Sequence, residues 1–118
     1  MHDFAVISLS DCLTPWEVII RLIRNASASD FILCLYNPKS RSRTEYIGIA
    51  REELLKHRSA TTPAGIVWNA GREGERSVIT NLDEMLKYDI DMFSVVIVGN
   101  TQTYVKNDRM LTPRRYKL

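Results

Sequence analysis

Short apolar runs alternate with longer segments of helical periodicity, and this alternation restricts the fold more than any other feature of the chain. The runs are Phe4 to Leu9, Phe31 to Tyr36, Ala64 to Trp68 and Ser94 to Val98. Such runs are typical of strands that are buried on both faces. Strands that alternate with helices predict βαβ units. We therefore expect an α/β domain with a mainly parallel or mixed sheet of about five strands and helices on both faces.

Two segments are expected to form the helices. Thr14 to Glu17 matches a capping box with a proline at the first helical position, and the apolar residues that follow recur at helical spacing. The second helix is expected from Arg43 to His57. We also expect a short extended piece over 77–79, a short helix that opens at 80–83, and a hairpin over 104–112 with its turn at Asn107-Asp108.

Length, charge and cysteine usage exclude several classes of function. The 118 residues suffice for one domain with its own core, and a net charge of +2 is too small for non-specific binding to nucleic acid or to an anionic membrane. Cys12 and Cys34 form no C-x-x-C pair and have no histidine nearby, so no metal site is expected. The chain contains no long apolar run and no recognisable signal peptide, which predicts a cytoplasmic protein without a membrane span.

Three of the expected strands are followed by an asparagine and a polar loop. These loops begin at Asn37, Asn69 and Asn100. In a parallel sheet all three would leave from one edge, where open α/β sheets bind their ligands. Two of the loops add arginines, whose planar guanidinium suits carboxylates and phosphates. Together they predict one site for an anionic small molecule, although each loop alone is also typical of an ordinary solvated turn.

No arrangement of residues predicts hydrolytic catalysis. His2 is terminal, and His57 is expected at a helix end, where it would stabilise the helix dipole. Glu73 and Glu75 alternate with arginines in the second polar loop, a pattern that favours ion pairing across the loop over acid–base catalysis.

The strand and loop motifs, taken in order, resemble the C-terminal half of the tetrapyrrole methylases, and within them the precorrin-3B C(17)-methyltransferase group. The matching stretches are Asp3 to Asp11 with Thr14 to Trp16, Leu35 to Pro38 with Ser40 and Arg43, Gly65 to Val67 with Asn69 to Glu75, and Val96 to Asn100 with Gln102 and Thr103. The resemblance covers nearly the whole chain. It implies the second domain of a two-domain, homodimeric enzyme whose N-terminal half is absent from this sequence.

The same resemblance implies a cofactor and a substrate. Members of the family bind S-adenosylmethionine between their two domains and transfer its methyl group to a tetrapyrrole, here precorrin-3B or its cobalt form, with ring contraction. The implied cofactor-binding residues are Tyr36, Asn37, Asn69, Ala70 and Pro113. The residues expected to face the substrate carboxylates are Arg41, Arg43 and Arg72.

Two functions therefore stay open from the sequence. The chain is either part of a methyltransferase, inactive until joined to its N-terminal half, or a non-catalytic α/β module that dimerises or binds anions. An exposed apolar surface, where the absent half would dock, favours the first function, whereas a wholly polar surface favours the second.

Overall fold

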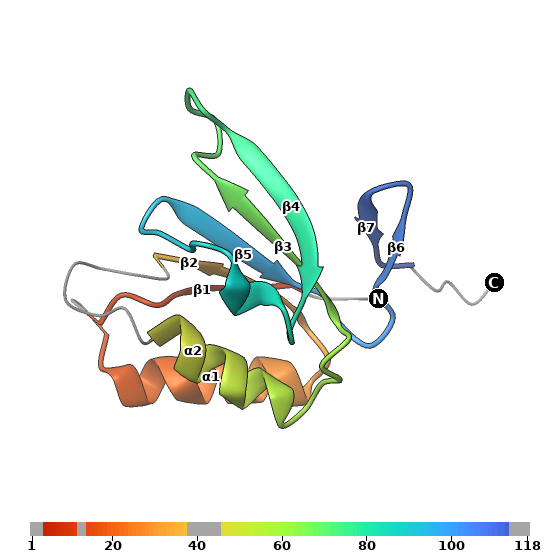
Figure 1. Cartoon of the computed structure of the whole chain (residues 1–118). Helices are drawn as coiled ribbons and strands as arrows, with labels where there is room; N and C mark the ends of the chain where they lie inside the picture. The colour runs from red at the N-terminus through yellow and green to blue at the C-terminus, as the bar shows by residue number, and fades with distance from the viewer. Residues whose placement is uncertain (1–3, 12–13, 38–45, 114–118) are drawn as a thin grey trace.

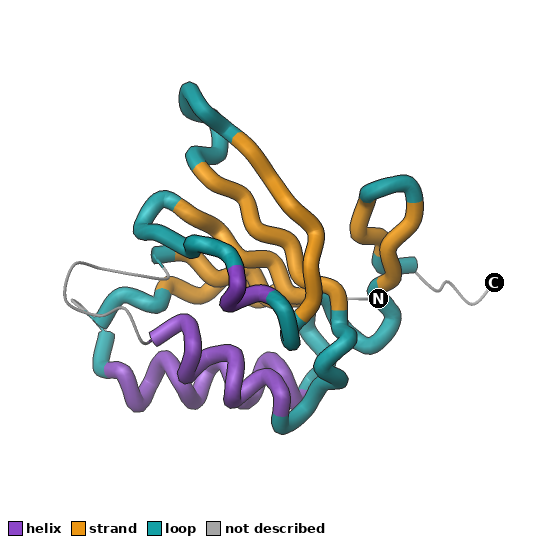
Figure 2. Tube along the Cα trace, in the orientation of Figure 1, coloured by secondary structure: helices purple, strands orange, loops and turns teal. Residues whose placement is uncertain are grey.

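The computed structural model describes residues 4–11, 14–37 and 46–113. The elements follow one another as β1 (Phe4–Ser8), α1 (Trp16–Ala28), β2 (Ile32–Tyr36), α2 (Tyr46–Leu55), β3 (Pro63–Trp68), β4 (Arg76–Asn81), the 3₁₀ helix η1 (Met85–Lys87), β5 (Ser94–Val98), β6 (Tyr104–Lys106) and β7 (Arg109–Leu111) (Figure 1, Figure 2). The four expected strands are present, although β1 is not buried on both faces as expected, because Phe4 and Val6 are exposed. The short extended piece expected after the third strand is a full strand, β4.

The strands β1 to β5 form one mixed sheet in the order β1-β2-β5-β3-β4. β1 and β2 are parallel, whereas β5 lies between β2 and β3 and is antiparallel to both. β4 is antiparallel to β3, because the polar loop at 69–75 is too short for the crossover that a parallel neighbour would need. The expected mixed sheet of five strands is therefore confirmed, with β1, β2 and β3 running in one direction.

Both helices lie on the same face of the sheet, where α1 and α2 contact each other (Figure 1). The connections β1-α1-β2 and β2-α2-β3 progress in the same direction across the sheet. Because such crossovers are right-handed, both place their helix on one side. The expectation of helices on both faces is therefore wrong for the described part of the chain.

The local signals for the helix starts have mixed outcomes. α1 begins at Trp16 after Pro15, whose backbone is extended, and no side chain caps the helix, so the expected capping box is not formed. The expected short helix after β4 is η1, and it is entered through a hydrogen bond from the Glu84 N–H to Asn81 Oδ1 (2.8 Å). The start of α2 at Arg43 lies outside the described residues, and its end at Leu55 comes two residues before the expected one.

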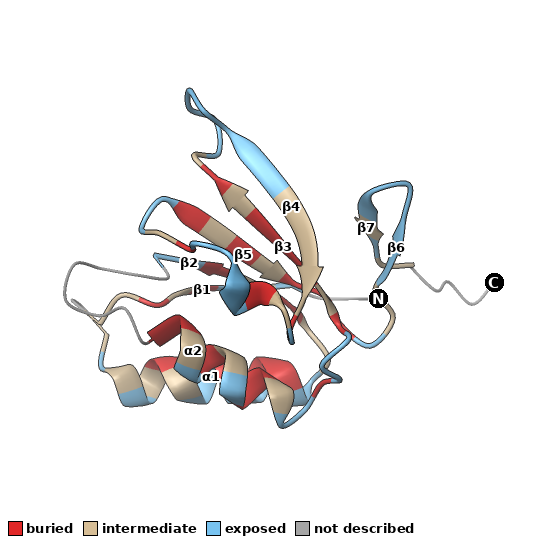
Figure 3. Ribbon diagram, in the orientation of Figure 1, coloured by how far each residue is buried: buried red, intermediate tan, exposed pale blue. Residues whose placement is uncertain are grey.

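The core lies between the sheet and the two helices (Figure 3). Every second residue of the central strands points into it, and the helices contribute one apolar stripe each. The largest fully buried side chains are Leu9, Ile19, Ile23, Leu33, Leu35, Leu54, Ile66, Leu82, Met85, Ile90, Val96 and Val98. No helix among the described residues is long and apolar enough to cross a membrane.

Among the described residues, the opposite face of the sheet carries only the β6–β7 hairpin. The expected turn at Asn107-Asp108 is confirmed, and both residues have positive φ (51° and 58°), as a tight hairpin turn requires. The hairpin reaches the sheet through Met110, whose Sδ lies 3.3 Å from the point where a side chain on Gly65 would begin. Much of this sheet face is therefore without a covering layer in the described chain (Figure 1).

Candidate functional site

The carboxyl ends of β1, β2 and β3 meet at one edge of the sheet, because these three strands run in the same direction. Tyr36 at the end of β2 and Val67 near the end of β3 both pair with Val95 of β5, so they stand in one row across the sheet. Two strand spacings separate them, which is about 10 Å. Tyr36 is 39% exposed on the sheet face that lacks helices. A small molecule at this edge can therefore contact the ends of both strands.

Asn37 and Asn69 turn the chain sharply where β2 and β3 end. Their φ angles are 52° and 54°, in the left-handed region that asparagine tolerates better than most residues. The Asn37 amide donates to Ser8 Oγ at 3.2 Å, which joins the ends of β1 and β2. The Asn69 N–H donates to the Phe93 carbonyl at 3.3 Å, which joins the end of β3 to the start of β5. Both asparagines thus have a local structural reason to stand at this edge.

The loop between β3 and β4 is closed by its own hydrogen bonds. The Arg72 N–H donates to the Asn69 carbonyl (2.9 Å), and the Gly71 N–H donates to Glu75 Oε1 (3.0 Å). Gly71 has a φ of +71°, a backbone conformation that glycine adopts without strain. This arrangement leaves Ala70 exposed at the tip, with only a methyl group between its backbone and an approaching ligand.

The arginines of this loop pack on aromatic rings and not on the neighbouring glutamates. The Arg72 guanidinium lies 4.7 Å from the centre of the Phe93 ring, and that of Arg76 lies 4.1 Å from the centre of the Trp68 ring. The expected ion pairing across the loop is therefore not what positions them. A guanidinium stacked on a ring keeps its N–H groups at the ring's periphery, where they remain able to bind a carboxylate.

The third polar loop does not join this site. Because β5 is antiparallel to β2 and β3, its end at Gly99 and Asn100 lies at the opposite edge of the sheet. Asn100 is buried there, and its amide donates to the Asp30 carbonyl at 3.2 Å. The expectation that all three loops leave from one edge is therefore wrong for Asn100.

Pro113 also stands away from the edge that carries Asn37 and Asn69. It follows Thr112, whose Oγ1 lies 2.7 Å from Thr103 Oγ1, and Thr103 is hydrogen-bonded to Asn100. Arg41 and Arg43 lie outside the described residues. The assignment of Pro113 to the cofactor and of these arginines to the substrate stays a prediction.

Phe93 and Ser8 belong to this edge, although sequence reasoning did not single them out. Phe93 comes to the site only because β5 runs antiparallel, which brings the start of that strand to the edge. The one signal for this direction is the polar loop at 69–75, which predicts a hairpin and therefore a reversal of the chain before β5. Ser8 was grouped with the first apolar run, and nothing local marks its hydroxyl as the partner of Asn37.

The described residues show neither a cluster that could bind a metal nor a reactive thiol. No cluster of three or more histidine, cysteine, aspartate or glutamate side chains that could hold a metal occurs within the described ranges. Burial raises the pKa of the Cys34 thiol, so this thiol stays protonated at neutral pH and is a poor nucleophile.

Comparison with known proteins gives close relatives over the full chain, although no family model matches. The chain is 50% identical over 117 residues to the cobalt-factor III methyltransferase of Priestia megaterium, which covers 99% of this chain and 22% of the relative. It is 49% identical over 118 residues to the probable cobalt-factor III C(17)-methyltransferase of Salmonella typhimurium, which covers all of this chain and 49% of the relative. This chain is homologous to the C-terminal part of such methyltransferases.

Solved structures show the same relationship. The crystal structure of the methyltransferase CobJ matches with a TM-score of 0.87 and 29% identity over 95% of this chain and 47% of that one. Uroporphyrin-III C-methyl transferase from Thermus thermophilus, complexed with S-adenyl homocysteine, matches with a TM-score of 0.60 and 22% identity over 83% of this chain and 42% of that one. The chain therefore has the fold of a tetrapyrrole methylase C-terminal domain, and it spans about half the length of CobJ and of the Salmonella relative.

Proposed function

We propose that this chain supplies the C-terminal half of the cleft of an S-adenosylmethionine-dependent methyltransferase that acts at C17 of cobalt-factor III or precorrin-3B. The observation that carries the proposal is the identity of 49% to 50% along essentially the entire chain with a cobalt-factor III methyltransferase and a probable cobalt-factor III C(17)-methyltransferase. The proposed place in metabolism is the biosynthesis of cobalamin.

The edge at the ends of β2 and β3 is the proposed cofactor side of the cleft. Its donor set fits a nucleoside with a polar amino-acid tail. Tyr36 offers an exposed ring, Asn37 and Asn69 offer amides on turned backbone, and Ala70 leaves its backbone approachable. Pro113 lies toward the opposite edge, so its proposed contribution requires the cofactor to extend along the sheet face that lacks helices.

The substrate is proposed to lie beside Arg72, with Arg41 and Arg43 as further partners for its carboxylates. S-adenosylmethionine, when bound, would supply an electrophilic methyl group to a nucleophilic carbon of the tetrapyrrole, with S-adenosylhomocysteine as the leaving group. This chemistry depends on alignment of donor and acceptor and requires no nucleophile of the protein. The residues of this chain therefore bind, orient and exclude water.

The exposed surface favours part of an enzyme over a self-contained module. Phe4 and Val6 on β1 are 67% and 66% exposed, and Met92 and Phe93 at the start of β5 are about half exposed. These residues lie at opposite ends of the strands and form two exposed apolar patches, and exposed apolar patches mark interaction sites. A complete non-catalytic module would be expected to carry polar residues there.

Calorimetry of S-adenosylhomocysteine binding tests the proposal. The protein compared with the isolated chain is a chimera in which the N-terminal half of the Salmonella typhimurium relative is joined to this chain. We expect the chimera to bind at least about tenfold more tightly than the isolated chain, because half a cleft leaves most of the ligand in water. A folded chimera that binds no S-adenosylhomocysteine would contradict the proposed function.

A further inference from the structure

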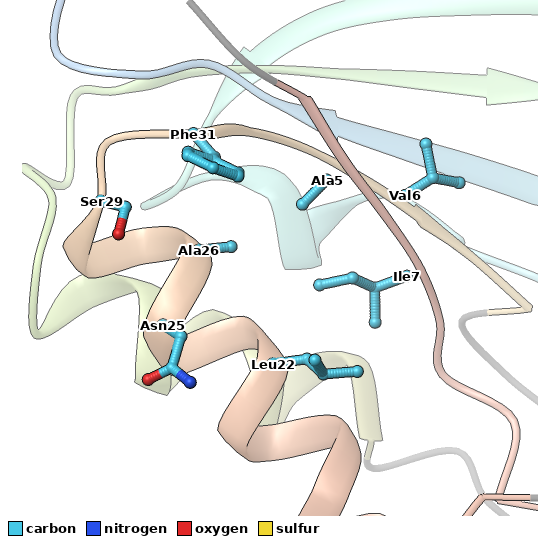
Figure 4. A pocket seen from close by; sticks show the side chains of 8 residues that line it. All are labelled: Ala5, Val6, Ile7, Leu22, Asn25, Ala26, Ser29 and Phe31. Carbon is cyan, nitrogen blue, oxygen red and sulfur yellow. The ribbon is translucent and has the colours of Figure 1, made fainter.

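An apolar groove runs between β1 and α1, away from the loops of the candidate site. Its volume is about 330 Å³, and its lining residues are Ala5, Val6, Ile7, Leu22, Asn25, Ala26, Ser29 and Phe31 (Figure 4). Figure 4 shows that side chains from the strand and from the helix point into the space between the two elements. None of these residues carries a charge, so the groove suits an apolar occupant.

The outer edge of β1 forms one wall of this groove, and no strand pairs with it in the described part of the chain. The Leu9 N–H bonds to the Tyr36 carbonyl of β2. Because backbone groups alternate in direction along a strand, the N–H and C=O of Phe4 and Val6 point away from β2. An unpaired apolar edge without lysine, proline or a bulge is a strong template for association.

The apolar surface continues from the groove over this edge. Phe4 (67% exposed) and Val6 (66%) lie on the strand, and Leu22 (48%) lies on the helix. Phe4 and Val6 project on the face of the sheet without helices, whereas Leu22 lies on the helix side beside the groove. We call these three residues and the groove, which lie on either side of the β1 edge, the β1-edge surface. Exposure of such side chains to water is unfavourable, by roughly 25 cal/mol of free energy for each Å² of apolar area.

The relatives indicate what covers the β1-edge surface. This chain matches the C-terminal part of the Salmonella typhimurium protein, and a segment of about equal length precedes the match. In that protein the preceding half therefore joins the matched part at the start of β1, beside Phe4. Phe4 pairs with Ile32 at the beginning of β2, at the opposite edge of the sheet from Asn37 and Asn69. A domain tethered at that point reaches the β1-edge surface without crossing the cofactor edge.

We propose that the N-terminal half of the complete methyltransferase packs on the β1-edge surface and inserts apolar side chains into the groove between β1 and α1. This inference rests on the proposed function, because it takes the missing half of that enzyme as the occupant. It adds a contact that is separate from the cleft and that fixes one domain relative to the other.

Hydrogen exchange on the chimera described above, with the isolated chain as reference, tests the contact. The amides of Phe4 and Val6 have no strand partner in the described chain, and the contact is expected to slow their exchange at least about tenfold. The amide of Ile49, on the outer side of α2, is the internal reference and should exchange equally in both proteins. Unchanged exchange along β1 in a folded chimera would overturn the proposal.

Substitutions give a second measurement that does not depend on exchange. Val6→Lys and Leu22→Lys replace exposed side chains, so the melting temperature of the isolated chain should stay within about 1 °C of the parent. In the chimera each should lower the melting temperature by at least about 4 °C, because a charge is then buried in an interface. Ile49→Lys, at a residue 39% exposed on α2, is the matched control and should be neutral in both proteins. Equal effects of Leu22→Lys in the two proteins would refute the contact.

Two further outcomes are distinguishable. If β1 is protected in the isolated chain in a concentration-dependent way, and light scattering gives the mass of two chains, a second copy covers the surface and the proposed occupant is wrong. If β1 is protected in the chimera but S-adenosylhomocysteine does not bind, the contact between the halves holds and the proposed function fails. If S-adenosylhomocysteine binds to the chimera but β1 is not protected, the proposed function holds and the proposed contact between the halves is wrong.

Discussion

The rings of Trp16 and Tyr46 stack with their centroids 3.9 Å apart and 7° between their planes. Each stands at the first turn of its helix, α1 or α2, and the Tyr46 hydroxyl donates to Asp11 Oδ2 at 2.7 Å. The stack therefore ties both helix starts to the segment that leaves β1, next to the edge where β1 and β2 end. We expect it to support the edge that we propose for the cofactor.

Removal of the Tyr46 hydroxyl should weaken this support without a loss of ring stacking. We expect Tyr46→Phe to lower the free energy of unfolding by about 1 kcal/mol, the usual net value of one hydrogen bond, when measured by urea denaturation. Tyr104→Phe, on the exposed strand β6, is the control and should change it by less than about 0.5 kcal/mol. Equal stability of Tyr46→Phe and the parent would show that the Asp11 contact contributes nothing.

Arg58 follows α2 and binds backbone carbonyls next to two strands. We expect its substitution to be among the most destabilising in the described chain. It is buried, and its guanidinium donates to the Gly99 carbonyl (2.7 Å) and to the Phe31 carbonyl. Arg58→Met keeps the volume but leaves two carbonyls without this donor, so we expect a loss of about 3 kcal/mol. Arg109→Met on the exposed hairpin should be nearly neutral in the same urea titration. A loss below about 1 kcal/mol for Arg58→Met would refute this role.

Much of this architecture follows from local signals. The turn at Asn107-Asp108 and the strand ends just before Asn37 and Asn69 follow from residue types that act over a few positions. The direction of β5 does not, because it depends on pairing with β2 and β3, which lie far away in sequence. For the same reason the sequence pattern predicts the wrong edge for Asn100 and gives no signal for Phe93. The side of the sheet that α2 covers follows from strand order, which no local pattern reports.

We expect Glu53 to make the free energy of unfolding depend on pH in the acid range. Its side chain is only 4% exposed, and its carboxylate lies 2.9 Å from the Lys56 ammonium and 2.6 Å from Arg24 Nε. Lys56, followed by Arg24, holds the pKa of Glu53 below its ordinary value. The folded state thus binds this proton less readily than the unfolded state. The stabilisation is complete well above the ordinary glutamate pKa of about 4.3 and is lost as pH falls through the lowered value.

The comparison of Glu53→Gln with the parent measures this effect. At pH 7 the variant should be less stable than the parent, and the difference should shrink as the pH is lowered from about 4.3 toward 3. Glu73→Gln, at an exposed loop position, should follow the parent at each pH. A difference between Glu53→Gln and the parent that is the same at pH 7 and pH 3 would contradict the assignment.

Ala70 gives a direct test of the cofactor edge. A bulky side chain at this exposed loop position costs the fold little, but it occupies the space through which a ligand would approach the backbone. We expect Ala70→Phe in the chimera to weaken S-adenosylhomocysteine binding at least about tenfold, or about 1.4 kcal/mol, with an unchanged melting temperature. Ala60→Phe, at an exposed loop position after α2, is the matched control. Undiminished binding by Ala70→Phe would move the cofactor away from the end of β3.

Substitution of Arg72 tests the proposed substrate side of the cleft separately from the proposed cofactor side. Its guanidinium is held over the Phe93 ring, so the chain orients the charge before any ligand arrives. In the chimera we expect Arg72→Ala to weaken binding of the carboxylated tetrapyrrole about 5- to 20-fold, as loss of one charge-assisted pair implies, and to leave S-adenosylhomocysteine affinity unchanged. Arg72→Lys should recover only part of the affinity, because an ammonium cannot bind a carboxylate through a planar fork. Phe93→Leu should give a smaller loss of the same kind, since it keeps the charge and removes only the ring that orients it. Unchanged tetrapyrrole affinity in Arg72→Ala would mean that the ring contact serves the loop alone and that the substrate carboxylates are bound elsewhere.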